Sequence, residues 1–398
     1  VQERATTIDA LPDELLAAVL ALVPLYRSDG SSLLELRLVS KRWKHVVRSE
    51  AVWAHRSLSI TSLPRSSNMA ALRLVPAIRS LKLEARLGKP LLRLRRLADT
   101  EECKIMELTV SIQLHKQSAD LLSETLQRRR LQLRDIVLRL VLSKATSDPS
   151  PVLAALERLP ELRRLTIDSD DGRKKPRVVN YQFNNFHKLQ FLYLGKNLSE
   201  NLVKSSIQAA KNTLREAYCS ETGLDVGQDV ASCPLVTTTS FQVGPGLEKI
   251  RKGQSSALET LTVICRDQYQ LQQLSTFLEN PEGLPCWIDV KLDLEEPDQC
   301  RALLREAGPS LRGVKTLSIK GAAGVEAREL AMVLLHMANL VSLELSDSGL
   351  DMGQLVGALT ALHAPALERL KFRGTGSMRW VRDLRLLRPG LRIDVPYA

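Results

Sequence analysis

The sequence predicts an α/β solenoid, with a curved parallel sheet on the concave side and helices on the convex side, preceded by a small three-helix domain. From residue 78 onward, an apolar-x-x-apolar-x-apolar frame recurs about every 26 residues. Stretches with apolar residues at three- and four-residue spacing, typical of helices, lie between its occurrences. Residues 1–58 lack the frame and carry helix-start signals instead. We therefore expect domains at 1–58 and 78–398, joined by a connecting segment at 59–77.

The frame occurs twelve times, which is the pattern expected of stacked repeats. The first copy is Ile78-Leu81-Leu83, the ninth is Trp287-Val290-Leu292, and the last is Leu367-Leu370-Phe372. Alternate side chains of a strand face one way, so the last two apolar residues of each frame should enter a core shared with neighbouring strands. The period and frame match leucine-rich repeats. Asn197 occupies the position expected after a strand, and Ser348 replaces it in a later repeat.

Helical segments between the strands complete the repeats. The clearest of them are Glu200–Ala210, Gln268–Leu278, Asp298–Glu306, Val325–Met337 and Met352–His363. The frame weakens between Glu221 and Gly253, where its spacing shortens and Gly/Pro turns gather. We expect irregular repeats with short connecting segments there, and a truncated last strand after Leu391.

The first 58 residues predict a cluster of short helices. Pro12, followed by two acidic residues, is a good helix start. Ser32 and Ser40 are candidate caps of two further helices, and the last of these carries Trp43. So small a domain buries little surface by itself, so we expect it to pack on the solenoid, on a partner, or on both.

Three stretches of this domain resemble an F-box: Leu11-Pro-Asp-Glu-Leu-Leu, Leu36-Arg-Leu-Val-Ser-Lys-Arg-Trp-Lys-His-Val-Val, and Val52-Trp53. With the repeats that follow, the chain is similar to the F-box/leucine-rich-repeat family. The link between Leu22 and Leu33 is a few residues longer than is usual for an F-box.

The resemblance implies a non-catalytic substrate-recognition subunit of a cullin-based (SCF) ubiquitin ligase, docked on a Skp-type adaptor. The residues that match the adaptor-binding motif are Leu11, Pro12, Leu15, Leu16, Val19, Leu20, Leu38, Val39, Ser40, Trp43 and Trp53. The alternative is that these apolar side chains form the domain's own core.

A protein substrate is expected on the outward-facing strand positions of the solenoid. Aromatic residues gather at Phe191, Tyr193 and Tyr218, and aromatic side chains dominate interface hot spots. Basic residues gather at Lys320, Arg369, Lys371 and Arg373, which would suit an acidic or phosphorylated segment. The alternatives are a solvated charged face and, for Phe191, packing beneath a loop.

Other function classes find little support. The sequence has no phosphate-binding loop, HExxH motif or nucleophile elbow, and its histidines do not lie at metal-ligand spacing. We expect neither an enzyme nor a cofactor.

A non-ligase binding scaffold remains an alternative. The net charge of +11 permits a nucleic-acid-associated solenoid, but no aromatic residues alternate with the arginine clusters to stack on bases. The apolar runs are too short to span a membrane. Six cysteines without a CxxC pair indicate a reducing compartment, cytoplasmic and/or nuclear.

Overall fold

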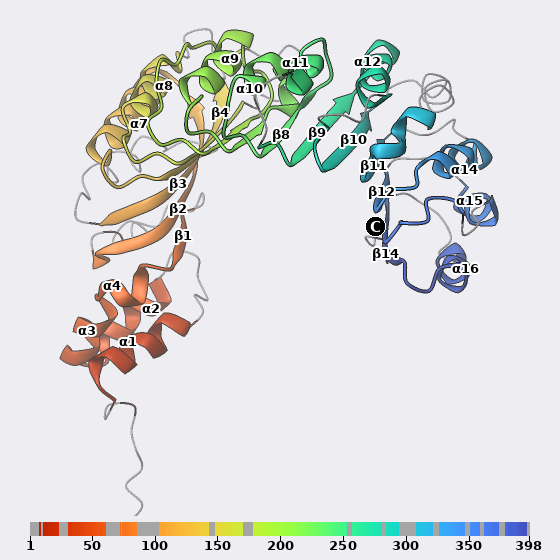
Figure 1. The fold of residues 1–398 in the computed structure, drawn as a ribbon. Coiled ribbons are helices and arrows are strands. Elements are labelled where there is room, and N and C mark those ends of the chain that lie inside the picture. The colour runs from red at the N-terminus through yellow and green to blue at the C-terminus, as the bar shows by residue number, and fades with distance from the viewer. Residues whose placement is uncertain are drawn as a thin grey trace, which may run out of the picture. The chain divides into compact units, whose positions relative to one another are not determined.

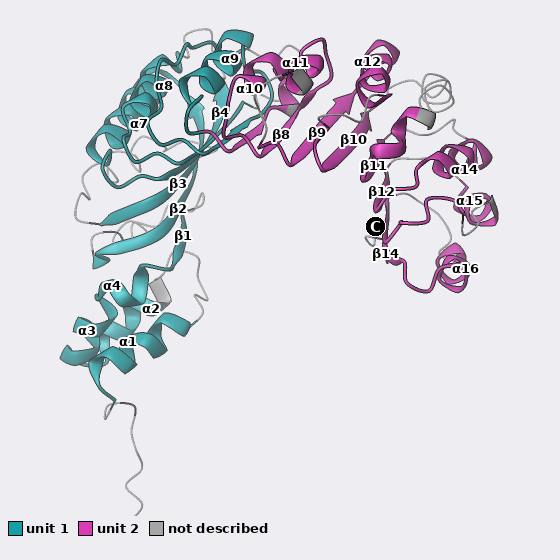
Figure 2. Ribbon diagram, in the orientation of Figure 1, with its two compact units in different colours: residues 1–213 teal, residues 214–398 magenta. Residues whose placement is uncertain are grey.

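The structure is a computed structural model, and it describes the greater part of the chain in two compact units, residues 1–213 and 214–398 (Figure 2). Each unit is considered by itself. The described residues are 8, 11–23, 31–60, 72, 74–85, 103–142, 148–169, 178–252, 257–279, 284–293, 308–320, 326–346, 351–358, 362–373 and 379–395.

The first unit begins with a domain of short helices (Figure 1). Its elements are α1 (Asp13–Leu22), α2 (Ser31–Glu35), η2 (Leu36–Leu38), α3 (Lys41–Val47) and α4 (Glu50–Trp53). Pro12 precedes α1, and two acids occupy its first turn, as the sequence predicts. The Ser40 hydroxyl caps α3 by accepting a hydrogen bond from the Trp43 amide at 3.1 Å, which confirms the predicted cap.

Parallel strands then follow in chain order, with helices on one side of the sheet (Figure 1). The strands are β1 (Ser57–Ile60), β2 (Ala77–Ala85), β3 (Lys104–Leu114), β4 (Asp135–Leu142), β5 (Arg164–Ser169) and β6 (Phe191–Leu194). The helices are α7 (Lys116–Arg128), α8 (Ser150–Glu157) and α9 (Glu200–Ala209). The side of the sheet away from the helices is called the open face below.

The second unit repeats the arrangement of strand and helix. Its strands are β7 (Glu216–Tyr218), β8 (Thr238–Gln242), β9 (Thr260–Cys265), β10 (Trp287–Asp293), β11 (Thr316–Lys320), β12 (Ser342–Ser346), β13 (Arg369–Arg373) and β14 (Arg392–Asp394). Its helical segments are η3 (Ser220–Thr222), α10 (Gly227–Ala231), α11 (Leu247–Lys252), α12 (Gln268–Glu279), η4 (Gly308–Gly313), α14 (Ala327–His336), α15 (Met352–Ala358) and α16 (Arg379–Leu387).

The strand register follows the sequence frame. In the first unit, Leu81 pairs with Leu108, and the same row continues through Ile136, Leu165 and Leu192. All of these side chains are buried. The apolar frame therefore specifies both the pairing and the core, because slipping by one residue would turn the leucines to the open face.

Two features of the sheet differ from the frame. Leu261 of β9 pairs with Ile288 and not with Val290, so the ninth frame is shifted by two residues at this junction. Trp287, the first apolar residue of this frame, is exposed, and its indole nitrogen donates to Asp289 Oδ1 at 2.6 Å. Strand β1 was not identified by the frame, yet Leu58 pairs with Leu81 of β2.

The predicted connections are largely present. Helices α9, α14 and α15 lie within the segments expected to be helical, α12 extends one residue beyond its predicted segment, and β14 is the expected last strand. The segment 221–253 contains short elements. The Asp225 carboxylate links two parts of this segment, because it accepts hydrogen bonds from the amides of Gly227 (3.0 Å) and Gly246 (2.6 Å). The predicted helix Asp298–Glu306 and Ser348 lie outside the described residues.

Asn197 adopts a left-handed backbone conformation. Its φ is 58°, in the left-handed region, which asparagine tolerates better than most residues. Its Nδ2 donates to the carbonyl of Ser169, in the preceding repeat, at 2.8 Å. The side chain thus links successive turns of the solenoid.

Candidate functional site

Helix α1 presents apolar side chains on two faces. Leu16 (0% exposed), Ala17 and Leu20 are buried against the rest of the helical domain. Leu15 (54% exposed), Val19 (40%) and Leu22 recur at four- and three-residue spacing, which places them together on the other face. A helix of one small domain needs one apolar stripe for its own core, so the second stripe is available to a partner.

Two further exposed apolar residues lie before α3. Leu38 is 78% exposed and Val39 is 61% exposed. The Arg42 side chain fixes this region to the start of α1, because its Nε donates to Asp13 Oδ1 at 2.7 Å and a second guanidinium nitrogen donates to the Leu11 carbonyl. We name the five residues Leu15, Val19, Leu22, Leu38 and Val39 the outer apolar set.

The predicted adaptor residues therefore divide by burial. Leu16, Leu20, Trp43 and Trp53 lie in the core of the domain, Leu11 is half-buried, and Pro12 and Ser40 are exposed. Trp53 is fixed by its indole nitrogen, which donates to the Val47 carbonyl at 2.5 Å. Adaptor contact for the four core residues stays a prediction, but the structure gives each of them a structural role.

Arg56 connects the helical domain to the sheet, a role that sequence reasoning missed. Its Nε donates to the Val52 carbonyl at 2.8 Å, and a terminal guanidinium nitrogen donates to the Leu20 carbonyl. Its own carbonyl accepts from the amides of Arg79 (3.0 Å) and Ser80 (3.2 Å) on β2. Burial lowers the pKa of this guanidinium. No sequence signal distinguishes Arg56 from the other arginines.

On the open face of the first unit, Phe191 and Tyr193 lie on β6, and both are half-buried. The Arg164 guanidinium carbon lies 4.2 Å from the centre of the Phe191 ring, a cation–π contact. Tyr218 belongs to the second unit, where its hydroxyl donates to Glu216 Oε2 at 3.2 Å. The structure therefore places two of the three predicted aromatic residues on one strand.

Two carboxylates at the same level of the first sheet were not predicted. Glu107 of β3 pairs in register with Asp135 of β4, and Arg164 follows on β5. Desolvation, followed by the nearby Glu107, raises the pKa of Asp135, and the arginines around it oppose this. Glu107 itself accepts from Arg79 Nε at 2.8 Å.

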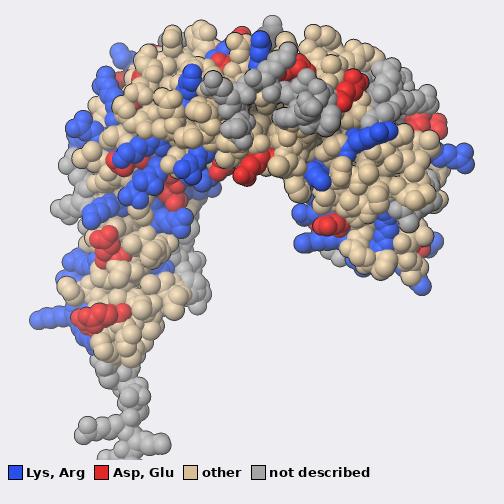
Figure 3. Space-filling model, viewed as in Figure 1, with Lys and Arg blue, Asp and Glu red and all other residues tan. Residues whose placement is uncertain are grey.

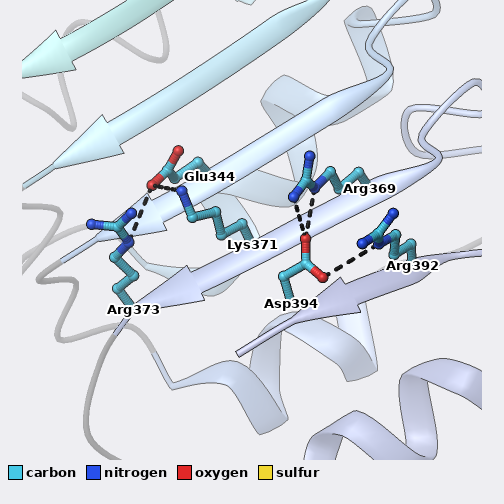
Figure 4. Close-up of polar contacts among 6 residues, drawn as sticks. All are labelled: Glu344, Arg369, Lys371, Arg373, Arg392 and Asp394. Atoms are coloured by element: carbon cyan, nitrogen blue, oxygen red, sulfur yellow. Dashed lines mark hydrogen bonds and ion pairs between the residues drawn. The ribbon is translucent and has the colours of Figure 1, made fainter. Parts of the chain in front are cut away.

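The predicted basic residues of the second unit are ion-paired on the open face (Figure 4). Glu344 receives Lys371 at 2.9 Å and Arg373 at 3.5 Å. Asp394 receives Arg369 at 2.6 Å and Arg392 at 3.4 Å. The hydrogen bond from Arg369 is the main cause that lowers the pKa of Asp394. Lys320 pairs separately with Asp293 at 3.1 Å.

Neither a metal centre nor a membrane helix is found in the described part of the chain. Those residues contain no group of three or more His, Cys, Asp or Glu side chains placed to hold a metal ion. None of their helices is both long and apolar enough to cross a bilayer. Basic and acidic side chains are interspersed on the surface seen in Figure 3.

Comparison with known families addresses the helical domain directly. The F-box-like family matches residues 8–59, the segment that carries α1 to α4 and the outer apolar set. Residues 8–59 are an F-box-like domain. With the repeats that follow this F-box-like domain, the predicted resemblance to the F-box/leucine-rich-repeat family is confirmed.

Among solved structures, an internalin from Listeria monocytogenes is similar, with 11% identity and a TM-score of 0.43, over 93% of this chain and 95% of that chain. No curated protein matches the sequence.

Proposed function

We propose that this chain is a substrate-recognition subunit of a cullin-based (SCF) ubiquitin ligase. The observation that carries the proposal is the outer apolar set on an F-box-like domain, a class of domain that generally binds Skp-type adaptors. The chain would be non-catalytic and would hold a protein substrate on its open face, while other subunits transfer ubiquitin. This role implies a cytoplasmic and/or nuclear location.

The energetics of the outer apolar set suit a stable interface. Burying one large apolar side chain contributes about 1.5–3 kcal/mol. Three such side chains are enough to separate tight from undetectable binding, since each 1.4 kcal/mol changes the dissociation constant about tenfold. Because Leu15, Val19 and Leu38 do not belong to the domain core, they can be truncated without removing the core.

The experiment is co-purification of the full chain with a Skp-type adaptor and a cullin. The test variant is Leu15→Ala/Val19→Ala/Leu38→Ala. The matched control is Leu386→Ala/Leu387→Ala, which truncates exposed leucines of α16 in the second unit. We expect stoichiometric recovery of the adaptor with wild type and control, and none with the test variant.

Two other outcomes would reassign the function. If a folded wild-type chain recovers no adaptor, the ligase role fails and the chain is a binding scaffold outside a ligase. If it binds nucleic acid with a steep loss of affinity as salt rises, the basic solenoid alternative holds. Adaptor recovery that is equal for wild type and test variant would show that another surface is used.

A further inference from the structure

On the open face of β12 to β14, four basic side chains share two carboxylates. Arg369, Lys371 and Arg373 occupy alternate positions of β13, and Arg392 lies beside Arg369 on β14. Glu344 and Asp394 accept from two cations each (Figure 4). The cluster therefore keeps a net charge of +2 at neutral pH, with the arginines more exposed than the carboxylates they contact.

The strand register places the acids in one central row. Glu344, Lys371 and Asp394 are neighbours in that row. The rows on either side have no acid on these strands: Ser342, Arg369 and Arg392 form one, and Ser346 and Arg373 form the other. Arg369 and Arg373 therefore reach their carboxylates diagonally across strands, whereas Arg392 reaches Asp394 two residues along its own strand. The two diagonal arginines can turn toward an incoming anion without crossing an acid in their own rows.

Small side chains flank these arginines on the neighbouring strand. Ser342 and Ser346 lie beside Arg369 and Arg373 on β12, and in the same two rows β11 carries Thr316 and Lys320. Alternate residues of a strand are about 6.6 Å apart, so Arg369, Lys371 and Arg373 span about 13 Å. Anionic side chains at alternate positions of an extended chain have the same spacing and lie on one face.

We propose that the β12–β14 open face binds an extended acidic segment of a partner protein, with anionic side chains at alternate positions. The bound carboxylates or phosphates would replace Glu344 and Asp394 as partners of the arginines, whose guanidinium groups bind either anion in a bidentate manner. The proposed function enters this proposal at one point, because it identifies the protein that carries the segment as the substrate of the ligase. The interspersed acids, and the absence of an exposed aromatic residue on described strands β11 to β14, favour a peptide over nucleic acid.

The experiment is fluorescence anisotropy with the full chain and labelled nine-residue peptides. One peptide carries glutamate at every second position, a second carries phosphoserine there, and a third carries serine. A fourth has the same number of glutamates in one contiguous block. We expect the alternating glutamate peptide to bind at least tenfold more tightly than the serine and block peptides. The phosphoserine arm shows whether phosphate or carboxylate is preferred.

Variants separate a binding site from a solvated charged face. Arg369→Gln/Arg373→Gln should weaken peptide binding at least tenfold. The control, Arg382→Gln/Arg385→Gln, removes the same charge from exposed positions of α16 and should change it less than twofold. Glu344→Gln/Asp394→Asn should tighten binding at least threefold, because it removes the competing carboxylates. Thermal melting of each variant checks its fold.

Three results would overturn the proposal. The first is equal affinity for the alternating and block peptides. The second is no gain in peptide affinity from Glu344→Gln/Asp394→Asn. The third is tighter binding of single-stranded oligonucleotides than of the acidic peptide. Adaptor co-purification with the same variants keeps the two proposals apart. If Arg369→Gln/Arg373→Gln still recovers the adaptor but wild type binds no peptide, the acidic-segment proposal fails and the ligase role stands. If wild type binds the peptide but no adaptor, only the ligase role fails.

Discussion

Leu15 and Leu16 are consecutive residues of α1, yet Leu16 is fully buried in the helical domain whereas Leu15 is more than half exposed. The pair shows how one helix serves two purposes. Its inner stripe packs in the core of the F-box-like domain, and its outer stripe is exposed. A substitution at one position should therefore change a different property from a substitution at the other.

The first prediction separates stability from binding. Leu16→Ala should lower the free energy of unfolding of the F-box-like domain by about 2–5 kcal/mol, because it leaves a cavity. Leu15→Ala should change it by less than about 0.5 kcal/mol, as is usual for exposed positions. Urea denaturation of the full chain, followed by tryptophan fluorescence, measures both. Equal destabilisation by the two variants would show that the outer stripe also belongs to the core.

The second prediction concerns Ser40. Ser40→Ala should destabilise the F-box-like domain by about 1 kcal/mol, because it removes the hydrogen bond to the Trp43 amide at the start of α3. Ser40→Asp should retain wild-type stability, since aspartate is an equally good cap. The same denaturation experiment compares them. If both substitutions destabilise equally, the hydroxyl has a role other than capping.

The third prediction tests the repeat asparagine. Asn197→Ala should destabilise the first unit by about 2–3 kcal/mol, because alanine is strained at positive φ and the bond to the Ser169 carbonyl is lost. Asn197→Gly loses only the bond, so it should cost at least about 1 kcal/mol less. Thermal melting ranks the variants. Glycine as costly as alanine would show that backbone strain is not involved.

The fourth prediction is a pH dependence at Asp135. Its folded-state pKa is raised above the ordinary value of 3.8, mainly by desolvation and then by Glu107. The folded protein therefore holds a proton that the unfolded chain has lost, and stability falls as the pH rises through that interval. Asp135→Asn removes this loss, so it should raise the melting temperature at pH 7 and leave it nearly unchanged at pH 3. A gain of the same size at both pH values would contradict the assignment.

Most of the solenoid could be predicted because its frame is a one-dimensional repeat. The buried row from Leu81 to Leu192 follows directly from leucine spacing, since each repeat contacts only its neighbours. The frame gave the wrong register between β9 and β10. Ile288, Val290 and Leu292 occupy alternate positions of β10, so two registers that differ by two residues bury equally apolar side chains. The frame also missed β1, whose pairing with β2 lies next to the buried Arg56.

The candidate sites were less predictable because they depend on which side chains stay exposed. Leu15 and Leu16 are chemically identical, and the sequence does not say which faces outward. Likewise, the arginines of β13 could be recognised as a basic row, but their carboxylate partners Glu344 and Asp394 lie on neighbouring strands. Which of these side chains form ion pairs depends on their conformations as well as on the strand register, and the basic row alone does not indicate its partners.

The most direct test of the account is calorimetric titration of a purified Skp-type adaptor into the full chain, comparing wild type with Leu15→Ala/Val19→Ala/Leu38→Ala. We expect a one-to-one complex with wild type and at least a hundredfold weaker binding by the variant, with the two proteins unfolding at the same urea concentration. Undiminished affinity of the folded variant would contradict the assignment of the outer apolar set as the adaptor-binding surface.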